Sequence, residues 1–351
     1  MKPILGFILA ALGTGFAIVF LRRLSPALGL VDQPGGRKEH DLPVPLVGGL
    51  GIFVAFVGTA IALGMGIIAG YFCVALAVII VVGLIDDLNE LRPIPKFAAQ
   101  IVACIIMIFG AGVQLKTVGN LMGFGPIGLS FLWVPAGVFA VVGVINAVNM
   151  IDGLDGLAGS VSLIAVVAFA AVAALSGLEA QFHVLVIFAG TLLAFLYFNM
   201  RYSSQPHAVV FLGDAGSMLL GFSLAWFAID LTQGPGRTFP PICALWIVVI
   251  PLCDTVSLLV RRIHAGKSPV IADREHVHHL LLAHGFTATQ TVWVLIFASI
   301  VTAFVGVGGW LLEIPQPLLF FAFVVLFAGY HLAAKRQWER LYAATDNAAS
   351  T

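Results

Sequence analysis

Charged residues are scarce in this sequence. Only 10% of the 351 residues are Asp, Glu, Lys or Arg, whereas 60% are hydrophobic and the mean hydropathy is +1.07. Because soluble domains carry about 25% charged residues, this composition excludes a soluble globular domain. Apolar runs of about 20 residues cross a bilayer as helices, so the composition indicates an all-α, polytopic integral membrane protein. The formal net charge is zero, and nucleic acid is not among the expected partners.

Cysteine is also rare. The four cysteines (Cys73, Cys104, Cys243 and Cys253) lie inside apolar runs, and none belongs to a CxxC pair. This placement is typical of buried thiols and does not indicate a disulfide framework. The sequence also lacks an internal repeat and a separate soluble domain. We therefore expect one membrane domain over residues 1–342 and a disordered tail over 343–351.

Eleven apolar segments are candidates for membrane spans. The run from residue 44 to residue 85 holds no charge and is too long for one helix, and its glycines at 64, 66 and 70 indicate a turn. The expected spans are 3–21, 44–63, 67–85, 97–113, 131–149, 157–176, 181–198, 213–230, 239–260, 291–312 and 316–334.

The basic residues are distributed unequally between the two sides that eleven spans define. Fourteen of the 17 lysines and arginines fall in the tail and in the loops after odd-numbered spans. Only Lys2, Lys116 and Arg237 fall on the other side. By the positive-inside rule the side with fourteen is cytoplasmic. The sequence therefore predicts an N-terminus outside and a C-terminus in the cytoplasm.

Four polar clusters interrupt the apolar sequence, all on the predicted cytoplasmic side. The largest is NAVNMIDGLDGLAG at 146–159, with Asn149, Asp152 and Asp155. Carboxylates at the end of a span are costly to desolvate, so each needs a metal, a partner or a water-filled cavity. Asp152 and Asp155 would share one face if this backbone were helical. The glycines of the stretch allow the backbone to approach a ligand or a neighbouring helix closely.

Two adjacent acids, Asp86 and Asp87, follow the third span in GLIDDLNE. Neighbouring carboxylates cannot both stay ionised when partly desolvated unless a cation lies between them. The pair therefore indicates a divalent metal or a proton taken from a substrate. Lys96, ten residues after Asp86, is a natural phosphate ligand. Alone, the pair also fits a solvated helix terminus, and Lys96 also fits a cytoplasmic anchor of the next span.

Asp214 stands among small residues in FLGDAGS, at the start of an apolar span. Mg²⁺ in proteins takes one or two carboxylates together with substrate phosphates, and this position suits it. The alternative is an aspartate that caps the start of a helix.

The fourth cluster is DREHVHH, with Arg274, His276, His278 and His279. Zinc would need further ligands, and neither a cysteine nor a second ligand pair accompanies these histidines. Arginine offers a bidentate fork to phosphate, so the set fits donors for a diphosphate or a sugar better. The alternative is a short amphipathic helix on the membrane surface, formed by HVHHLLLAHGF.

Together the clusters supply the groups needed for Mg²⁺-assisted chemistry on a diphosphate at one membrane face. Five motifs carry a more specific resemblance: RKEHDLPVPLVGG, GLIDDLNE, NAVNMIDGLDGLAG, FLGDAGS and DREHVHH, in this order from Arg37 to His279. Through them the chain resembles the polyprenyl-phosphate N-acetylhexosamine-1-phosphate transferases over most of its length. Within that family it is most similar to the WecA-like branch, because the related MraY enzymes end in a different histidine motif.

The resemblance implies an enzyme of the bacterial cytoplasmic membrane, with its active site facing the cytoplasm. It would transfer N-acetylglucosamine 1-phosphate from UDP-N-acetylglucosamine to undecaprenyl phosphate and release UMP. Mg²⁺ would be the cofactor, and Mn²⁺ would substitute for it. The lipid bilayer and a second copy in a homodimer would be further partners.

The resemblance also implies roles for individual residues. Asp86 and Asp87 would be catalytic, one of them accepting the proton of the lipid phosphate. Asn149 and Asp214 would hold Mg²⁺ and the pyrophosphate. The substrate-binding residues would be Lys96 at a phosphate, Asp155 at the uracil, Asp152 without a defined contact, and Arg274, His276, His278 and His279 at the sugar diphosphate.

Two other functions stay open. One is the same reaction with another UDP-hexosamine, including a muramoyl-pentapeptide donor. The other is a secondary transporter that uses carboxylates for coupling ions. Transporter sites usually lie near the bilayer midplane on broken helices, whereas these acids lie at span ends, which favours an enzyme. For the reaction itself, direct attack of the lipid phosphate on the β-phosphorus is favoured over a covalent aspartyl intermediate.

Overall fold

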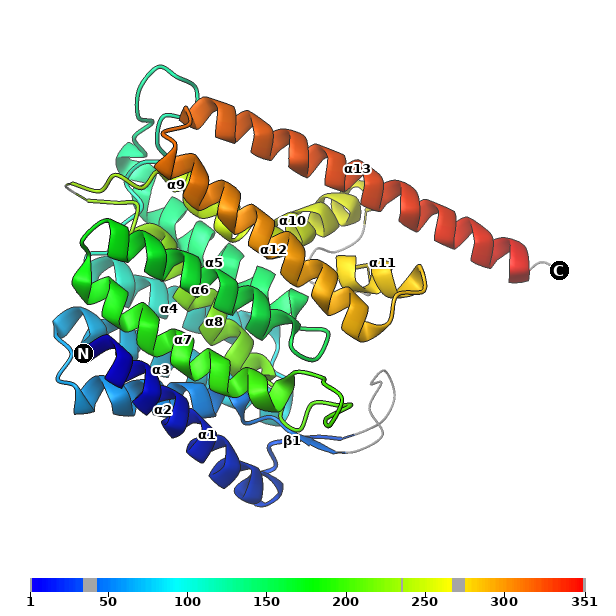
Figure 1. Cartoon of the computed structure of the whole chain (residues 1–351). Coiled ribbons are helices and arrows are strands. Elements are labelled where there is room, and N and C mark those ends of the chain that lie inside the picture. Colours follow the sequence, from blue (N-terminus) through cyan, green and yellow to red (C-terminus); the bar gives the residue numbers. More distant parts are fainter. Residues whose placement is uncertain (1, 34–42, 235, 267–274, 350–351) are drawn as a thin grey trace.

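The computed structural model describes residues 2–33, 43–234, 236–266 and 275–349. Most of its helices lie side by side in one bundle (Figure 1). The helices are α1 (Lys2–Leu28), α2 (Gly48–Ala62), α3 (Ile67–Asn89), α4 (Pro93–Ile105), α5 (Trp133–Ile151), α6 (Leu157–Leu175), α7 (Glu179–Asn199), α8 (Gly213–Asp230), α9 (Pro241–Ile247), α10 (Val249–His264), α11 (Val277–Ala283), α12 (Ala288–Leu311) and α13 (Gln316–Ala349). A π-helical turn (Ile106–Gly110) continues α4, a 3₁₀ turn (Ser130–Leu132) precedes α5, and β1 (Val31–Asp32) pairs antiparallel with β2 (Val44–Pro45).

Each predicted span coincides with a helix or a pair of helices. Within the described residues, eight helices are long and apolar enough to cross a membrane, and a ninth span results if α9 and α10 are taken together. This confirms an all-α, polytopic membrane architecture. The two further predicted spans correspond to α2, which is apolar but has only 15 residues, and to α8. The predicted glycine turn lies between α2 and α3, where Gly64 has a φ of 61°.

The predicted span 239–260 is divided in the structure. Helices α9 and α10 meet at Val248 with a bend of 84°. Pro251 explains the break, since it has no backbone N–H to donate to the carbonyl of Ile247 four residues earlier. The prediction of one continuous span over 239–260 is therefore wrong in this respect, because an apolar run alone does not reveal a bend at a proline.

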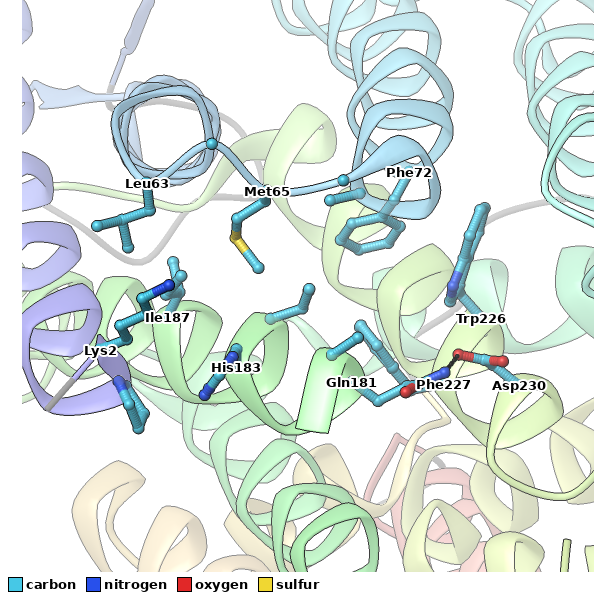
Figure 2. Close-up of a pocket in the computed structure, with 16 residues that line it drawn as sticks. Lys2, Leu63, Met65, Phe72, Gln181, His183, Ile187, Trp226, Phe227 and Asp230 are labelled. Atoms are coloured by element: carbon cyan, nitrogen blue, oxygen red, sulfur yellow. Dashed lines mark hydrogen bonds between the residues drawn. The ribbon is translucent and has the colours of Figure 1, made fainter. Parts of the chain in front are cut away.

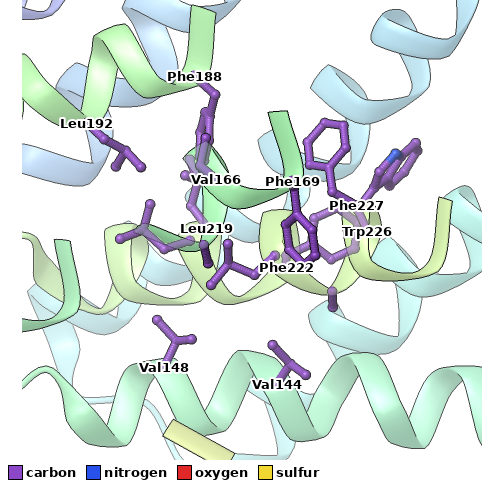
Figure 3. Close-up of a cluster of buried hydrophobic side chains, with 14 of the residues drawn as sticks. Val144, Val148, Val166, Phe169, Phe188, Leu192, Leu219, Phe222, Trp226 and Phe227 are labelled. Carbon is purple, nitrogen blue, oxygen red and sulfur yellow. The ribbon is translucent and has the colours of Figure 1, made fainter. Parts of the chain in front are cut away.

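Helix α8 runs through the core of the bundle. It packs against α3 and α5, with further contacts to α2 and α6. Its side chains Leu219 and Phe222 lie among Val148, Phe169 and Phe188 of the surrounding helices (Figure 3). A helix that is apolar on all sides is expected at the centre of a bundle. The acidic residues of α8 are therefore confined to its two ends, and the first of them belongs to the candidate site.

Small residues bring α2 and α3 into direct contact with the first turns of α8. A Cβ added to Gly83 of α3 would overlap the backbone of Ala215, and one added to Gly49 of α2 would overlap the backbone of Gly216. Glycine at such crossings allows two helix backbones to approach each other. The crossing at Gly83 places the end of α3 beside the start of α8.

The C-terminal helix extends well beyond the predicted last span. Helix α13 runs from Gln316 to Ala349, and its second half projects past the rest of the bundle (Figure 1). The division of the chain into a membrane domain over 1–342 and a disordered tail over 343–351 stays a prediction.

Replacing Gly83 with valine tests the close crossing of α3 and α8. The new side chain meets backbone atoms, so the helices must separate, and such overpacking costs about 1–3 kcal/mol. The thermal unfolding midpoint of the purified protein in detergent should fall accordingly. Gly70→Val on the same helix is the matched control, because a Cβ there meets no atom within 4 Å. Equal midpoints for the two variants would contradict the crossing.

Candidate active site

The polar clusters of the sequence meet where four helices end or begin. Asp86 and Asp87 lie in the last turn of α3, and Lys96 lies in the first turns of α4. Asn149 is near the end of α5, and Asp214 opens α8. Hydrogen bonds and ion pairs connect all five side chains in one network. The structure thus brings together residues that lie up to 128 positions apart, between Asp86 and Asp214.

Lys96 lies between two carboxylates. Its Nζ is 2.7 Å from Oδ2 of Asp86 and 3.3 Å from Oδ2 of Asp214. The backbone N–H of Leu91 donates to the other oxygen of Asp86 at 2.7 Å. The Asp86 side chain is almost fully buried, whereas that of Asp214 is 41% exposed. A buried carboxylate requires such partners, and Asp214 is the more exposed acid of this pair.

Asp87 caps the start of α8 from a neighbouring helix. Its carboxylate accepts the backbone N–H of Asp214 at 2.7 Å and that of Ala215 at 3.3 Å. The first N–H groups of a helix lack partners within the helix, and an acid there also interacts well with the helix dipole. Gly213 has a φ of 74°, and a Cβ on it would lie 2.6 Å from the Asp87 carboxylate. The cap of α8 is therefore Asp87 and not Asp214, whose carboxylate is directed elsewhere.

Asn149 completes the surroundings of Asp214. Its amide donates to Oδ1 of Asp214 at 2.9 Å and to the hydroxyl of Ser217 at 2.7 Å. Ser217 was not among the predicted site residues. It stands three positions after Asp214 in the FLGDAGS motif, so helical spacing alone places it on the same face and could have identified it.

The turn between α5 and α6 carries Asp152 and Asp155, and it is not helical. The condition for a shared helical face is therefore not met. Burial, reinforced by the negative charges of Asp214, Asp155 and Asp87, raises the pKa of Asp152 to about 8. Asp155 is held differently, because its Oδ2 lies 2.7 Å from Nε of Arg201 and accepts the backbone N–H of Ala208 at 3.1 Å.

The histidine motif contains the predicted short helix, α11, and is anchored by an acid that sequence reasoning missed. Nδ1 of His276 lies 2.7 Å from Oδ2 of Asp254 on α10. The other oxygen of Asp254 accepts the backbone N–H of Val277 at 2.8 Å and the hydroxyl of Tyr330 at 2.7 Å. Asp254 is 1% exposed. It fixes the start of α11 against α10 and α13.

His278 packs directly on the aspartate-bearing turn. A Cβ on Gly153 would overlap the imidazole of His278, which explains the need for glycine there. Burial and the neighbouring His279 and His276 lower the pKa of His278 to about 3, so its imidazole is neutral at physiological pH. Within the described residues neither of its ring nitrogens has a hydrogen-bond partner. Such a buried, unpaired donor indicates a ligand or water at this position.

Of the four predicted residues of the histidine segment, the structure describes His276, His278 and His279. Arg274 lies outside the described residues. Of the described residues, no three His, Cys, Asp or Glu side chains form a group that could hold a metal ion. The ring centroids of His276 and His278 are 5.5 Å apart and those of His278 and His279 are 4.1 Å apart.

Comparison with known proteins gives the family. A model described as glycosyl transferase family 4 matches residues 68–232. The chain belongs to this family. An undecaprenyl-phosphate α-N-acetylglucosaminyl 1-phosphate transferase of Haemophilus influenzae is 33% identical over 93% of this chain and 92% of its own length. Proteins with the same name from Pasteurella multocida (33%, 95% and 94%) and Escherichia coli K12 (32%, 93% and 89%) are similarly related. These relatives confirm the resemblance to the WecA-like branch of the polyprenyl-phosphate N-acetylhexosamine-1-phosphate transferases.

Asp254→Asn tests the anchor of the histidine segment. An amide cannot accept all three hydrogen bonds of the carboxylate, and a buried donor without a partner costs about 1–3 kcal/mol. The backbone amides of α11 should therefore exchange with solvent at least about fivefold faster, measured by hydrogen–deuterium exchange. Tyr330→Phe, which leaves the bonds to His276 and Val277 in place, should have a smaller effect. Unchanged exchange in Asp254→Asn would contradict the anchoring role.

Proposed function

We propose that the protein transfers N-acetylglucosamine 1-phosphate from UDP-N-acetylglucosamine to undecaprenyl phosphate and releases UMP. The observation that carries this proposal is the network of Asp86, Lys96, Asn149 and Asp214 at the helix ends, in a chain whose relatives along nearly its full length bear the name of this activity. The network combines carboxylates, a lysine and an amide at one end of a membrane bundle. These groups suit a diphosphate that arrives from water and a phosphate that arrives from the bilayer.

Asp86 is the residue that accepts the proton of the lipid phosphate in this proposal. Both oxygens of Asp87 already bind the backbone of α8, so Asp87 positions Asp214. Asp86 is paired with the flexible Lys96. When Lys96 turns to a substrate phosphate, one oxygen of Asp86 becomes available. Direct attack on the β-phosphorus then follows, with the lipid phosphate as the nucleophile.

The residues around Asp214 fit Mg²⁺. This ion uses only one or two carboxylates and takes its other ligands from water and substrate phosphates, and Asp214 is partly exposed with Asn149 beside it. Lys96 lies between the two carboxylates, and this contact with a positive charge supports an environment that attracts cations. When bound, Mg²⁺ would stabilise negative charge on the diphosphate and on the departing UMP. Mn²⁺, with similar oxygen ligands, would replace it.

The turn between α5 and α6 and the histidine segment would bind the nucleotide sugar. In the described part of the chain only Oδ2 of Asp155 makes hydrogen bonds, so its Oδ1 is available to the N–H of a uracil. The neutral His278 offers one N–H donor and one acceptor. His276, His279 and Arg274 would contact the sugar diphosphate, and Asp152 lies in the same turn as Asp155.

The membrane orientation follows from the distribution of basic residues. We infer eleven crossings, with α2 and α8 as short buried spans, and the network of Asp86 and Asp214 at the cytoplasmic face of a bacterial inner membrane. The acids lie at helix ends, whereas coupling-ion sites of transporters lie near the midplane. This placement supports the transferase over a transporter.

An assay with purified protein tests the proposed reaction. With Mg²⁺, UDP-N-acetylglucosamine and undecaprenyl phosphate, it should release UMP and form the lipid-linked sugar diphosphate. Asp86→Asn and Asp214→Asn should each lower turnover about a hundredfold or more, the scale of losing a proton-transfer or charge-stabilising group. Asp214→Asn should also weaken the apparent affinity for Mg²⁺. Arg340→Ala, on the exposed end of α13, is the control and should keep its turnover.

Two results would overturn this assignment. One is a higher kcat/KM with the UDP-muramoyl-pentapeptide donor than with UDP-N-acetylglucosamine. The other is the absence of UMP release from every UDP-hexosamine by protein that is folded and correctly inserted. Near-normal turnover in both acid variants would indicate that Asp86 and Asp214 have only a structural role.

Cysteine labelling tests the orientation. A cysteine at Asn89, next to the acidic pair, should react only with reagents that reach the cytoplasm. One at Gly234, in the turn after α8, should react from outside the cell. The native cysteines are buried or partly buried, which limits their background reaction. Labelling of both positions from the same side would exclude the eleven-crossing arrangement.

A further inference from the structure

A cavity of about 550 Å³ lies at the other end of the bundle from the acidic network, and Figure 2 shows the residues that line it. It is enclosed by the start of α1, the turn between α2 and α3, the start of α7 and the end of α8. Ala69 of α3 lines it, and Asp86 stands 17 residues further along the same helix, about 26 Å away at the rise of an α-helix. The cavity is therefore separate from the candidate active site.

The walls of the cavity are largely apolar. Met65, Phe72, Ile187 and Phe227 contribute to them, and Figure 2 shows these side chains around the open space. Protein interiors leave few voids larger than a water molecule. The volume lies within the range of about 300–1,000 Å³ that is usual for ligand sites, so an apolar ligand fits.

The rim of the cavity carries positive charge and hydrogen-bond donors. Lys2 and His183 line it, and within the described residues neither has a hydrogen-bond or ion-pair partner. The starts of α1, α3 and α7 add the partial positive charge of helix N-termini, which the C-terminal ends of α2 and α8 partly offset, so Lys2 supplies most of the positive charge. The acid on the lining, Asp230, is already bound by Gln181 at 3.1 Å and by Arg237 at 3.4 Å. The rim is thus complementary to an anion.

A buried donor lies one helical turn deeper than Asp230. Trp226 is 1% exposed and lines the cavity. In the described part of the chain its indole N–H has no hydrogen-bond partner. The N–H can therefore donate to a ligand in the cavity that carries an oxygen acceptor, such as an ester carbonyl, in addition to its apolar part.

We propose that the cavity binds one acyl chain of an anionic phospholipid, with the phosphate at Lys2 and His183 and an ester oxygen at Trp226. A phospholipid combines the three required features: an alkyl chain, an ester and a negative phosphate. It is also the apolar molecule that surrounds the bundle at high concentration. With the orientation inferred above, the site faces the outer leaflet. The proposal depends on none of the catalytic assignments.

Photocrosslinking tests the site in the full-length protein reconstituted in vesicles. The probe is phosphatidylglycerol with a diazirine in one acyl chain. After irradiation and digestion, mass spectrometry should find the label on peptides that contain Phe72 or Trp226. Unlabelled phosphatidylglycerol should compete more strongly than unlabelled phosphatidylcholine.

Two glycines provide matched variants. A Cβ at Gly66 or at Gly70 meets no atom within 4 Å, so a side chain can start from either position without overlap. Of these two glycines, Gly66 lines the cavity and Gly70 does not. Gly66→Phe should lower labelling of the Phe72 and Trp226 peptides at least about tenfold, the effect of about 1.4 kcal/mol, whereas Gly70→Phe should label like the natural protein.

The double variant Lys2→Gln, His183→Gln tests the charged rim. The preference for phosphatidylglycerol over phosphatidylcholine should fall about fivefold, since one basic residue near anionic lipid contributes about 1 kcal/mol. Equal labelling in Gly66→Phe and the natural protein would overturn the proposal. So would equal competition by the two lipids, or displacement of the probe by undecaprenyl phosphate but not by phosphatidylglycerol.

Discussion

The contact between the Asp87 carboxylate and the first N–H groups of α8 holds the candidate site together. Helix α8 is the buried centre of the bundle, and neither Leu212 before it nor Gly213 at its start offers a side chain that could cap it. Asp87 supplies the cap from α3. The approach is possible because Gly83 and Gly213 have no side chains at the crossing. One interaction therefore satisfies the start of a buried helix and sets Asp214 beside Lys96 and Asn149.

Pairing of opposite charges explains how a chain with so few charged residues can keep several of them buried. Asp86 has Lys96, Asp155 has Arg201, and Asp230 has Arg237. Each pair joins residues from different elements or from the two ends of a turn, so it fixes position as well as offsetting desolvation. Asp152 differs from these acids. The charges that surround it are other carboxylates, and together with burial they raise its pKa.

Much of this structure could be predicted from the sequence, because apolar runs and clustered polar motifs report burial and helix ends directly. Each of the eleven predicted spans corresponds to a helix or a pair of helices. The family resemblance implies catalytic or metal-binding roles for four of the five residues in the acidic network, and a phosphate contact for the fifth, Lys96. Other features could not be found in this way. Asp254 is a single acid within an apolar run, and its partners His276 and Tyr330 lie 22 and 76 positions later. The role of Asp87 as a cap depends on a helix crossing that local sequence does not report.

The position of Lys96 between two carboxylates also has a consequence for inhibition. Without a ligand its ammonium group is already neutralised by Asp86 and Asp214, so a substrate diphosphate must draw it away from them. A compound that replaces the diphosphate by an uncharged bridge leaves this ion pair intact. Such a compound avoids both the cost of separating the pair and the cost of desolvating its own phosphates. Neutral analogues of the nucleotide sugar are therefore the chemical class that can bind beside the network without separating this ion pair.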